Sequence, residues 1–161
     1  VLGKKMAEND MVLQYHNHDF EFVKIDGKYA LDILYTEAGP ELLQTQIDTC
    51  WVNVGGEDPA AYIRKFKGRA PVVHLKDFHV EGKQEGDPYA LIGLNEGEKK
   101  AKSAFEFRPL GKGVQNIPSI IEASKKAGSK WLIVEQDQPS MGKTPMECAA
   151  MSLEYLKNGK K

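Results

Sequence analysis

The chain has 161 residues, 41% of them hydrophobic and 28% charged, and a formal net charge of -1. Lys and Arg (22) balance Asp and Glu (23), which excludes a general polyanion binder such as a nucleic-acid-coating protein. No apolar run approaches the roughly 20 residues needed to cross a bilayer, and the two cysteines form neither a metal motif nor a disulfide framework. We therefore expect a cytoplasmic protein that binds neither nucleic acid nor membrane.

Short runs rich in Val, Ile and Leu alternate with helix-like segments along the chain. In chain order, the pattern predicts strands at 11–18, 41–48, 70–78 and 130–137, separated or followed by helices at 29–38, 59–66, 116–128 and 144–159. This alternation is typical of an α/β protein with a parallel sheet. The polar, weakly periodic stretch at about 81–104 interrupts it, and we predict a single domain, 1–161, with a long loop there.

Three of the predicted strands carry a potential metal ligand at the end of an apolar run: Asp48, His74 and Glu135. Each residue has an ordinary alternative role, because strand-end Asp often caps a helix and a lone His in VVHL is often a core residue. Glu135 follows WLIV, where a carboxylate needs a partner such as a cation. The carboxyl ends of parallel strands meet at one edge, so the three together predict a divalent metal site.

The first predicted strand offers a fourth ligand in the segment YHNHDFEF, which contains His16, His18 and Glu21. His16 and His18 share one face, since strand side chains alternate, and Glu21 follows where the strand would turn into its loop. The alternative is that one His packs and the other bonds to a neighbouring strand. We choose Glu21 first, and leave His16 and His18 open.

Other residues near these strand ends are candidates for binding a substrate. Lys76 is two residues after His74 and would contact a substrate oxygen, unless it forms a structural pair with Asp77. Trp51 is either a sugar-stacking platform or part of the core, and Arg108 either binds a hydroxyl-rich substrate or lies on the surface. His18 joins this substrate-binding set.

Four motifs resemble the sugar phosphate isomerase/epimerase family with the xylose-isomerase-like TIM barrel: YHNHDFEF, IDTCWVNVGGEDPAAYIRKFKGRAPVVHLKD, PLGKG and WLIVEQD. The resemblance implies a (β/α)8 barrel of which this sequence holds the second half, strands five to eight. It implies one divalent metal ion, Mn, Mg, Co or Zn, with Glu21, Asp48, His74 and Glu135 as ligands. A half barrel would leave apolar surface and two sheet edges uncovered, so we expect a homo-oligomer or pairing with the N-terminal half.

The same resemblance implies chemistry beside a carbonyl of a carbohydrate, through an enediolate stabilised by the metal as a Lewis acid. Glu135 would act as ligand and base, with Glu21 or His16 as its catalytic partner. Our first functional prediction is a metal-dependent sugar isomerase or epimerase. The alternatives are a lyase or dehydratase acting on a keto-sugar or inosose with the same site, and a non-catalytic truncated barrel that serves as an assembly piece.

Overall fold

The computed structural model describes residues 1–80 and 105–159, so the predicted long loop at 81–104 lies outside the described residues. The chain divides into two compact units. The first unit comprises Val1–Leu75 and Pro118–Ile133, and the second comprises Lys76–Ile117 and Val134–Lys161.

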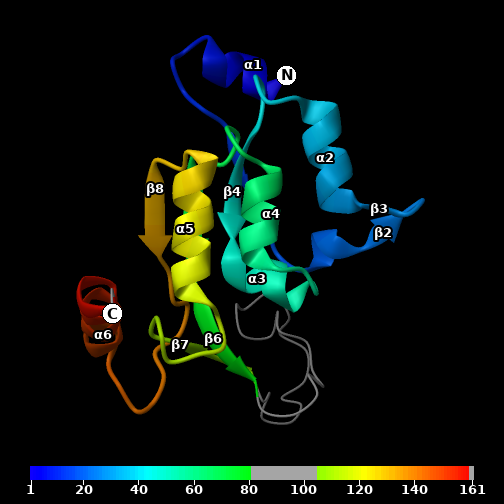
Figure 1. Ribbon diagram of the computed structural model, residues 1–161. Coiled ribbons are helices and arrows are strands. Elements are labelled where there is room, and N and C mark those ends of the chain that lie inside the picture. Colours follow the sequence, from blue (N-terminus) through cyan, green and yellow to red (C-terminus); the bar gives the residue numbers. More distant parts are fainter. Residues whose placement is uncertain (81–104, 160–161) are drawn as a thin grey trace. The chain divides into compact units, whose positions relative to one another are not determined.

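A parallel sheet forms the centre of the first unit (Figure 1). Its strand order is β1-β4-β5-β8, with β1 at Gln14–His16, β4 at Gln44–Asp48, β5 at Val72–Leu75 and β8 at Trp131–Val134. The pairs β1–β4 and β4–β5 are parallel, and Asp48 lies directly opposite His74 in the register. The strands predicted at these places are confirmed, and parallel pairing brings their carboxyl ends to one edge.

Helix α1 (Leu2–Ala7) precedes the first strand, and the helices between the strands are α2 (Ala30–Ala38), α3 (Thr49–Val54), α4 (Pro59–Lys65) and α5 (Ile117–Ala127). A 3-10 turn, η1 (Phe20–Phe22), and a small antiparallel pair, β2 (Lys24–Ile25) with β3 (Lys28–Tyr29), lie between β1 and α2. Helix α4 begins as predicted, because the Asp58 carboxylate accepts from the Ala61 N–H and Pro59 occupies the first turn. Ile47, Ile63 and Val73 are fully buried in the core beneath.

The second unit contains an antiparallel pair, β6 (Asp77–Val80) with β7 (Phe105–Arg108), and helix α6 (Pro145–Asn158). Thr144 and Glu147 cap α6 in the predicted capping box. The single strand predicted at 70–78 is wrong in one respect. Strand β5 ends at Leu75, and the chain starts a separate pairing at Asp77.

The described helices are all shorter or more polar than a bilayer-crossing segment requires.

Candidate metal centre

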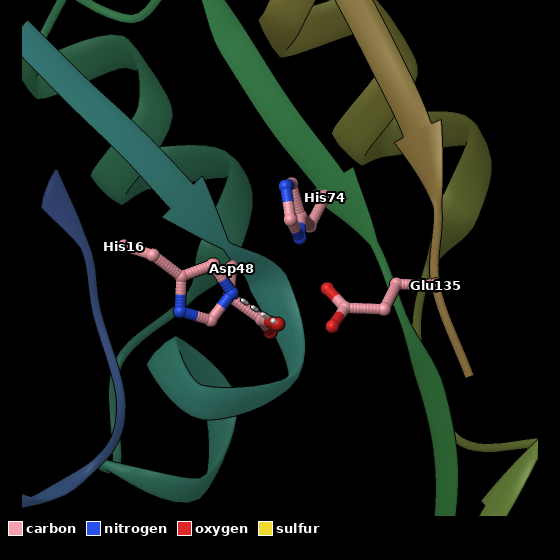
Figure 2. A group of neighbouring side chains, drawn as sticks. All are labelled: His16, Asp48, His74 and Glu135. Atoms are coloured by element: carbon pink, nitrogen blue, oxygen red, sulfur yellow. Dashed lines mark ion pairs between the residues drawn. The ribbon is translucent and has the colours of Figure 1, made fainter. Parts of the chain in front are cut away.

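Three potential ligands converge at the carboxyl ends of neighbouring strands in the first unit. His16 ends β1, Asp48 ends β4, and His74 lies on β5. Each offers one ligand atom, and these atoms lie within 4.8 Å of one another. The rings of His16 and His74 meet edge to face with centroids 4.8 Å apart, and His16 Nε2 is 3.2 Å from Asp48 Oδ2. Figure 2 shows His16, Asp48 and His74 at the strand ends.

The two carboxylate oxygens of Asp48 have different partners. Oδ1 accepts hydrogen bonds from the Cys50 and Trp51 N–H groups, at 2.8 and 3.1 Å, and so caps α3. Oδ2 faces His16 Nε2. Both roles considered for Asp48 from the sequence therefore fit one side chain, because the helix cap and the histidine use different oxygens. This cap also explains why α3, a helix that we did not predict, begins immediately after the strand.

Two polar side chains that we did not predict hold the backbone of this site. Asn17 is fully buried; its Oδ1 accepts from the Asp48 N–H at 3.0 Å, and its Nδ2 donates to the Asp48 carbonyl at 3.3 Å. The Thr49 hydroxyl donates to the His74 carbonyl at 2.8 Å. The signal for Asn17 was its position between His16 and His18, because alternation turns it away from the ligand face and into the protein.

The structure does not bring Glu21, our first choice for the fourth ligand, into this group. Its Oε1 accepts from the Tyr15 hydroxyl at 2.7 Å and its Oε2 from the His18 N–H at 2.8 Å. Burial, followed by the hydrogen bond and the charge of Glu21, raises the pKa of Tyr15 to about 12. Glu21 therefore braces the turn after β1, and His16 lies in the group of potential ligands.

Aromatic rings adjoin the ligand group on one side. The His18 ring stacks on Phe20 at 5.6 Å, is 5.5 Å from Trp51, and meets His16 edge to face at 5.1 Å. Trp51 is fully buried, which does not support the sugar-stacking role that we considered for it. Substrate binding by His18 stays a prediction.

In the second unit, a buried lysine lies between two carboxylates. Lys76 is 1% exposed, and its Nζ is 2.8 Å from Asp137 Oδ2 and 3.6 Å from Glu135 Oε1. The ammonium also lies over the Phe107 ring, 5.0 Å from its centroid. We did not single out Asp137 from the sequence, although its place two residues after Glu135 was the available signal.

The remaining second-unit candidates are engaged with neighbouring groups. Arg108 Nη2 pairs with Glu106 Oε2 at 2.5 Å on β7, so its predicted substrate contact stays a prediction. The Asp77 carboxylate accepts hydrogen bonds from the backbone N–H groups of Phe78, Gly111, Gly113 and Gln115.

The chemistry of the donor set fits a divalent metal. Two imidazoles and a carboxylate are ligands that Mn²⁺, Co²⁺ and Zn²⁺ accept in proteins. Asp48 is fully buried, and a buried carboxylate is stable only with compensating positive charge or hydrogen bonds. The Asn17 and Thr49 contacts fix the backbone beneath the ligands, as supporting residues of metal sites commonly do.

A parallel sheet with ligands at its carboxyl edge is the class of site found in (β/α) barrels. The chain belongs to the xylose isomerase-like TIM barrel family, whose sequence profile matches residues 2–159. The family and the fold predicted from the motifs are thus confirmed.

Two inosose dehydratases are similar in sequence to nearly the whole of this chain. An inosose dehydratase from Lacticaseibacillus casei is 28% identical over 156 residues, which cover 96% of this chain and 50% of that protein. An inosose dehydratase from Clostridium beijerinckii is 26% identical over 161 residues, covering 97% and 50%. The chain therefore spans about half the length of these relatives.

Solved structures show the same fold. A sugar phosphate isomerase/epimerase from Parabacteroides distasonis superposes with a TM-score of 0.73 at 20% identity, covering 98% of this chain and 49% of that one. The probable 3-DHS dehydratase AsbF from Bacillus anthracis gives a TM-score of 0.68 at 15% identity, covering 96% and 52%. At these identities the likeness concerns the fold.

Proposed function

We propose that this chain carries the metal-binding part of a lyase that removes water from a polyhydroxylated ketone, such as a keto-sugar or an inosose. The observation that carries the proposal is the convergence of His16, Asp48 and His74 at three strand ends. The names of the two inosose dehydratases support dehydration over isomerisation, which was our first prediction.

Glu135 is our proposed fourth ligand and base. It comes directly after β8, which neighbours β5 in the sheet order, so its strand continues the series that bears the other ligands. A carboxylate at that place completes a set of two imidazoles and two carboxylates, which suits one divalent cation. When bound, the cation would supply a Lewis acid that polarises a substrate carbonyl.

The proposed reaction begins with proton removal. A Glu135 oxygen accepts the proton from the carbon beside the carbonyl, and the electron pair of that C–H bond forms a carbon–carbon double bond. The hydroxyl on the next carbon leaves and takes up a proton, so one water is released. Lys76 is our candidate for hydrogen bonding to a substrate oxygen, since its ammonium lies beside Glu135.

The experiment has two stages on this chain. First, protein purified without chelator is analysed for bound metal and titrated with Mn²⁺ by calorimetry. Second, the loaded protein is incubated with an inosose in D₂O, and water loss is followed by mass spectrometry and ultraviolet absorbance.

Water loss that is abolished in Glu135→Gln supports the dehydratase. Deuterium incorporation without water loss identifies the isomerase or epimerase instead. Metal binding with neither reaction favours the non-catalytic assembly piece, and absence of metal binding by the folded chain refutes the proposed site. Glu122→Gln serves as the matched control, because Glu122 pairs with Lys126 on exposed helix surface.

A further inference from the structure

Strand β1 ends before it reaches the level of the ligand residue Asp48 on β4. The backbone register pairs Gln14–His16 with Gln44–Gln46, and Asp48 lies two residues beyond the last of these pairs. Asp48 is fully buried, and buried backbone N–H and C=O groups need hydrogen-bond partners. Beside Asp48, another group must therefore take the place of the β1 backbone.

The side chain of Asn17 takes this place. Its Oδ1 accepts from the Asp48 N–H at 3.0 Å, and its Nδ2 donates to the Asp48 carbonyl at 3.3 Å. A carboxamide offers a donor and an acceptor like those of a peptide group, so it can bond to both backbone groups of one residue, as a neighbouring parallel strand would. Asn17 is itself fully buried, so solvent cannot readily replace either bond.

This contact links two of the potential metal ligands of the first unit. Asn17 follows His16 directly in the chain, and alternation turns the two side chains to opposite sides. The His16 imidazole faces Asp48 Oδ2 at 3.2 Å, while the Asn17 carboxamide holds the Asp48 backbone. All three residues, and His74, belong to the segment Val1–Leu75 of one compact unit. Asn17 thus restrains the position of the Asp48 carboxylate relative to the His16 ring.

We propose that Asn17 is a positioning residue of the metal centre: its carboxamide extends the pairing of β1 with β4 beyond His16, and so holds His16 and Asp48 at a fixed separation for one divalent cation. The inference rests on the proposed function, in which these two residues are ligands. In this role Asn17 acts through the Asp48 backbone and not on the cation. Its loss should therefore weaken metal binding as well as stability.

The test compares Asn17→Leu with Thr45→Val in the whole chain. Leucine resembles asparagine in shape but can neither donate nor accept. Thr45 lies on the same strand, is also fully buried, and donates its hydroxyl to the Arg69 carbonyl at 2.9 Å. Urea unfolding should show reduced stability in both variants, because each loses buried hydrogen bonding. Calorimetry should show Mn²⁺ affinity reduced about tenfold or more in Asn17→Leu, as for other residues that support metal ligands, and unchanged in Thr45→Val.

The absorption spectrum of bound Co²⁺ gives a second readout, since it depends on the ligand geometry. It should change in Asn17→Leu and match the parent in Thr45→Val. If Asn17→Leu does not fold, Asn17→Ser replaces it with the same expectation, because the shorter side chain leaves room for water at the Asp48 backbone. Parental affinity and spectrum in a folded Asn17 variant overturn the inference, as does an equal loss of affinity in Thr45→Val. Failure of the proposed function is distinguishable, since the parent itself would then bind neither Mn²⁺ nor Co²⁺, or would bind the metal and leave the inosose unchanged.

Discussion

At the residue scale, the bonds that each side chain makes distinguish His16 from Glu21 as the candidate ligand from the first strand. Both Glu21 oxygens accept short hydrogen bonds, from Tyr15 and from the His18 backbone, whereas His16 faces Asp48 Oδ2 and the His74 ring. Its two hydrogen bonds make Glu21 part of the turn after β1, whereas the His16 imidazole lies among the potential ligand atoms.

His16→Gln is therefore expected to weaken Mn²⁺ binding by at least about tenfold, while Glu21→Gln leaves the affinity within a few fold. Glu21→Gln should instead lower the denaturation midpoint, because it disturbs two hydrogen bonds of a buried carboxylate. Calorimetry and urea unfolding of the two variants check this. The reverse pattern of affinities would restore Glu21 as the ligand.

The Tyr15–Glu21 bond also predicts a dependence on alkaline pH. The folded-state pKa of Tyr15 is raised from 10.0 to about 12, so the phenol contributes stability that is complete below pH 10 and lost as the pH rises toward 12. The variant Tyr15→Phe has no phenol to ionise, so its stability does not depend on pH through this group. Urea unfolding of parent and variant across that range should show a smaller fall in the variant, and equal slopes would contradict the assignment.

The sequence indicated which residues are candidate ligands, but not the hydrogen bonds and ion pairs that these residues make with their neighbours. Asp48, His74 and Glu135 were found because each ends an apolar run, a pattern that survives in a single sequence. Asn17 and Asp137 were missed because their roles depend on partners 31 residues away or on a neighbouring element, and alternation alone does not reveal such partners.

At the element scale, Asp77 explains why the predicted strand at 70–78 divides. One carboxylate oxygen accepts from Phe78 and Gln115, and the other from Gly111 and Gly113, so the side chain organises the 111–115 loop. A Cβ on Gly113 would lie 2.2 Å from Asp77 Oδ1, which requires glycine there. Residues 72–80 contain no glycine or proline, so no turn signal in the sequence marks the break.

Asp77→Asn should lower the free energy of unfolding by about 2 kcal/mol, because the amide can turn only one oxygen toward these buried donors. Asp58→Asn is the matched control, since Asn caps a helix about as well as Asp and Asp58 caps α4. Chemical denaturation compares the two. Equal stabilities would show that the carboxylate does not organise the loop.

The other elements were predicted well where local rules are strong. Pro59 after an Asp cap and the capping box before α6 mark helix starts that the structure reproduces. Strand β7 and helix α3 were not predicted, because β7 depends on pairing with β6 and α3 depends on the Asp48 cap, neither of which is a periodic signal.

At the scale of the whole molecule, strand β8 ends the sheet order and exposes apolar side chains. Trp131 is 66% and Ile133 41% exposed, and alternation puts both on one face of the strand. Large apolar groups beside an end strand favour association. Light scattering at micromolar concentration should give a mass above 18.0 kDa, and Trp131→Lys should reduce it. A monomer of 18.0 kDa that unfolds cooperatively would contradict this.

The contact between Trp51 and Asp48 makes tryptophan fluorescence a probe of metal binding at the candidate centre. The Trp51 backbone N–H donates to the carboxylate of Asp48, which also faces His16, and only one other tryptophan, Trp131, is present. Acrylamide should quench the exposed Trp131 and spare the buried Trp51. The emission that remains should then shift when Zn²⁺ is added, because the charge on Asp48, which accepts from the Trp51 backbone, is then compensated, and it should stay constant in His16→Gln. Fluorescence would thus follow occupancy of the centre without any label.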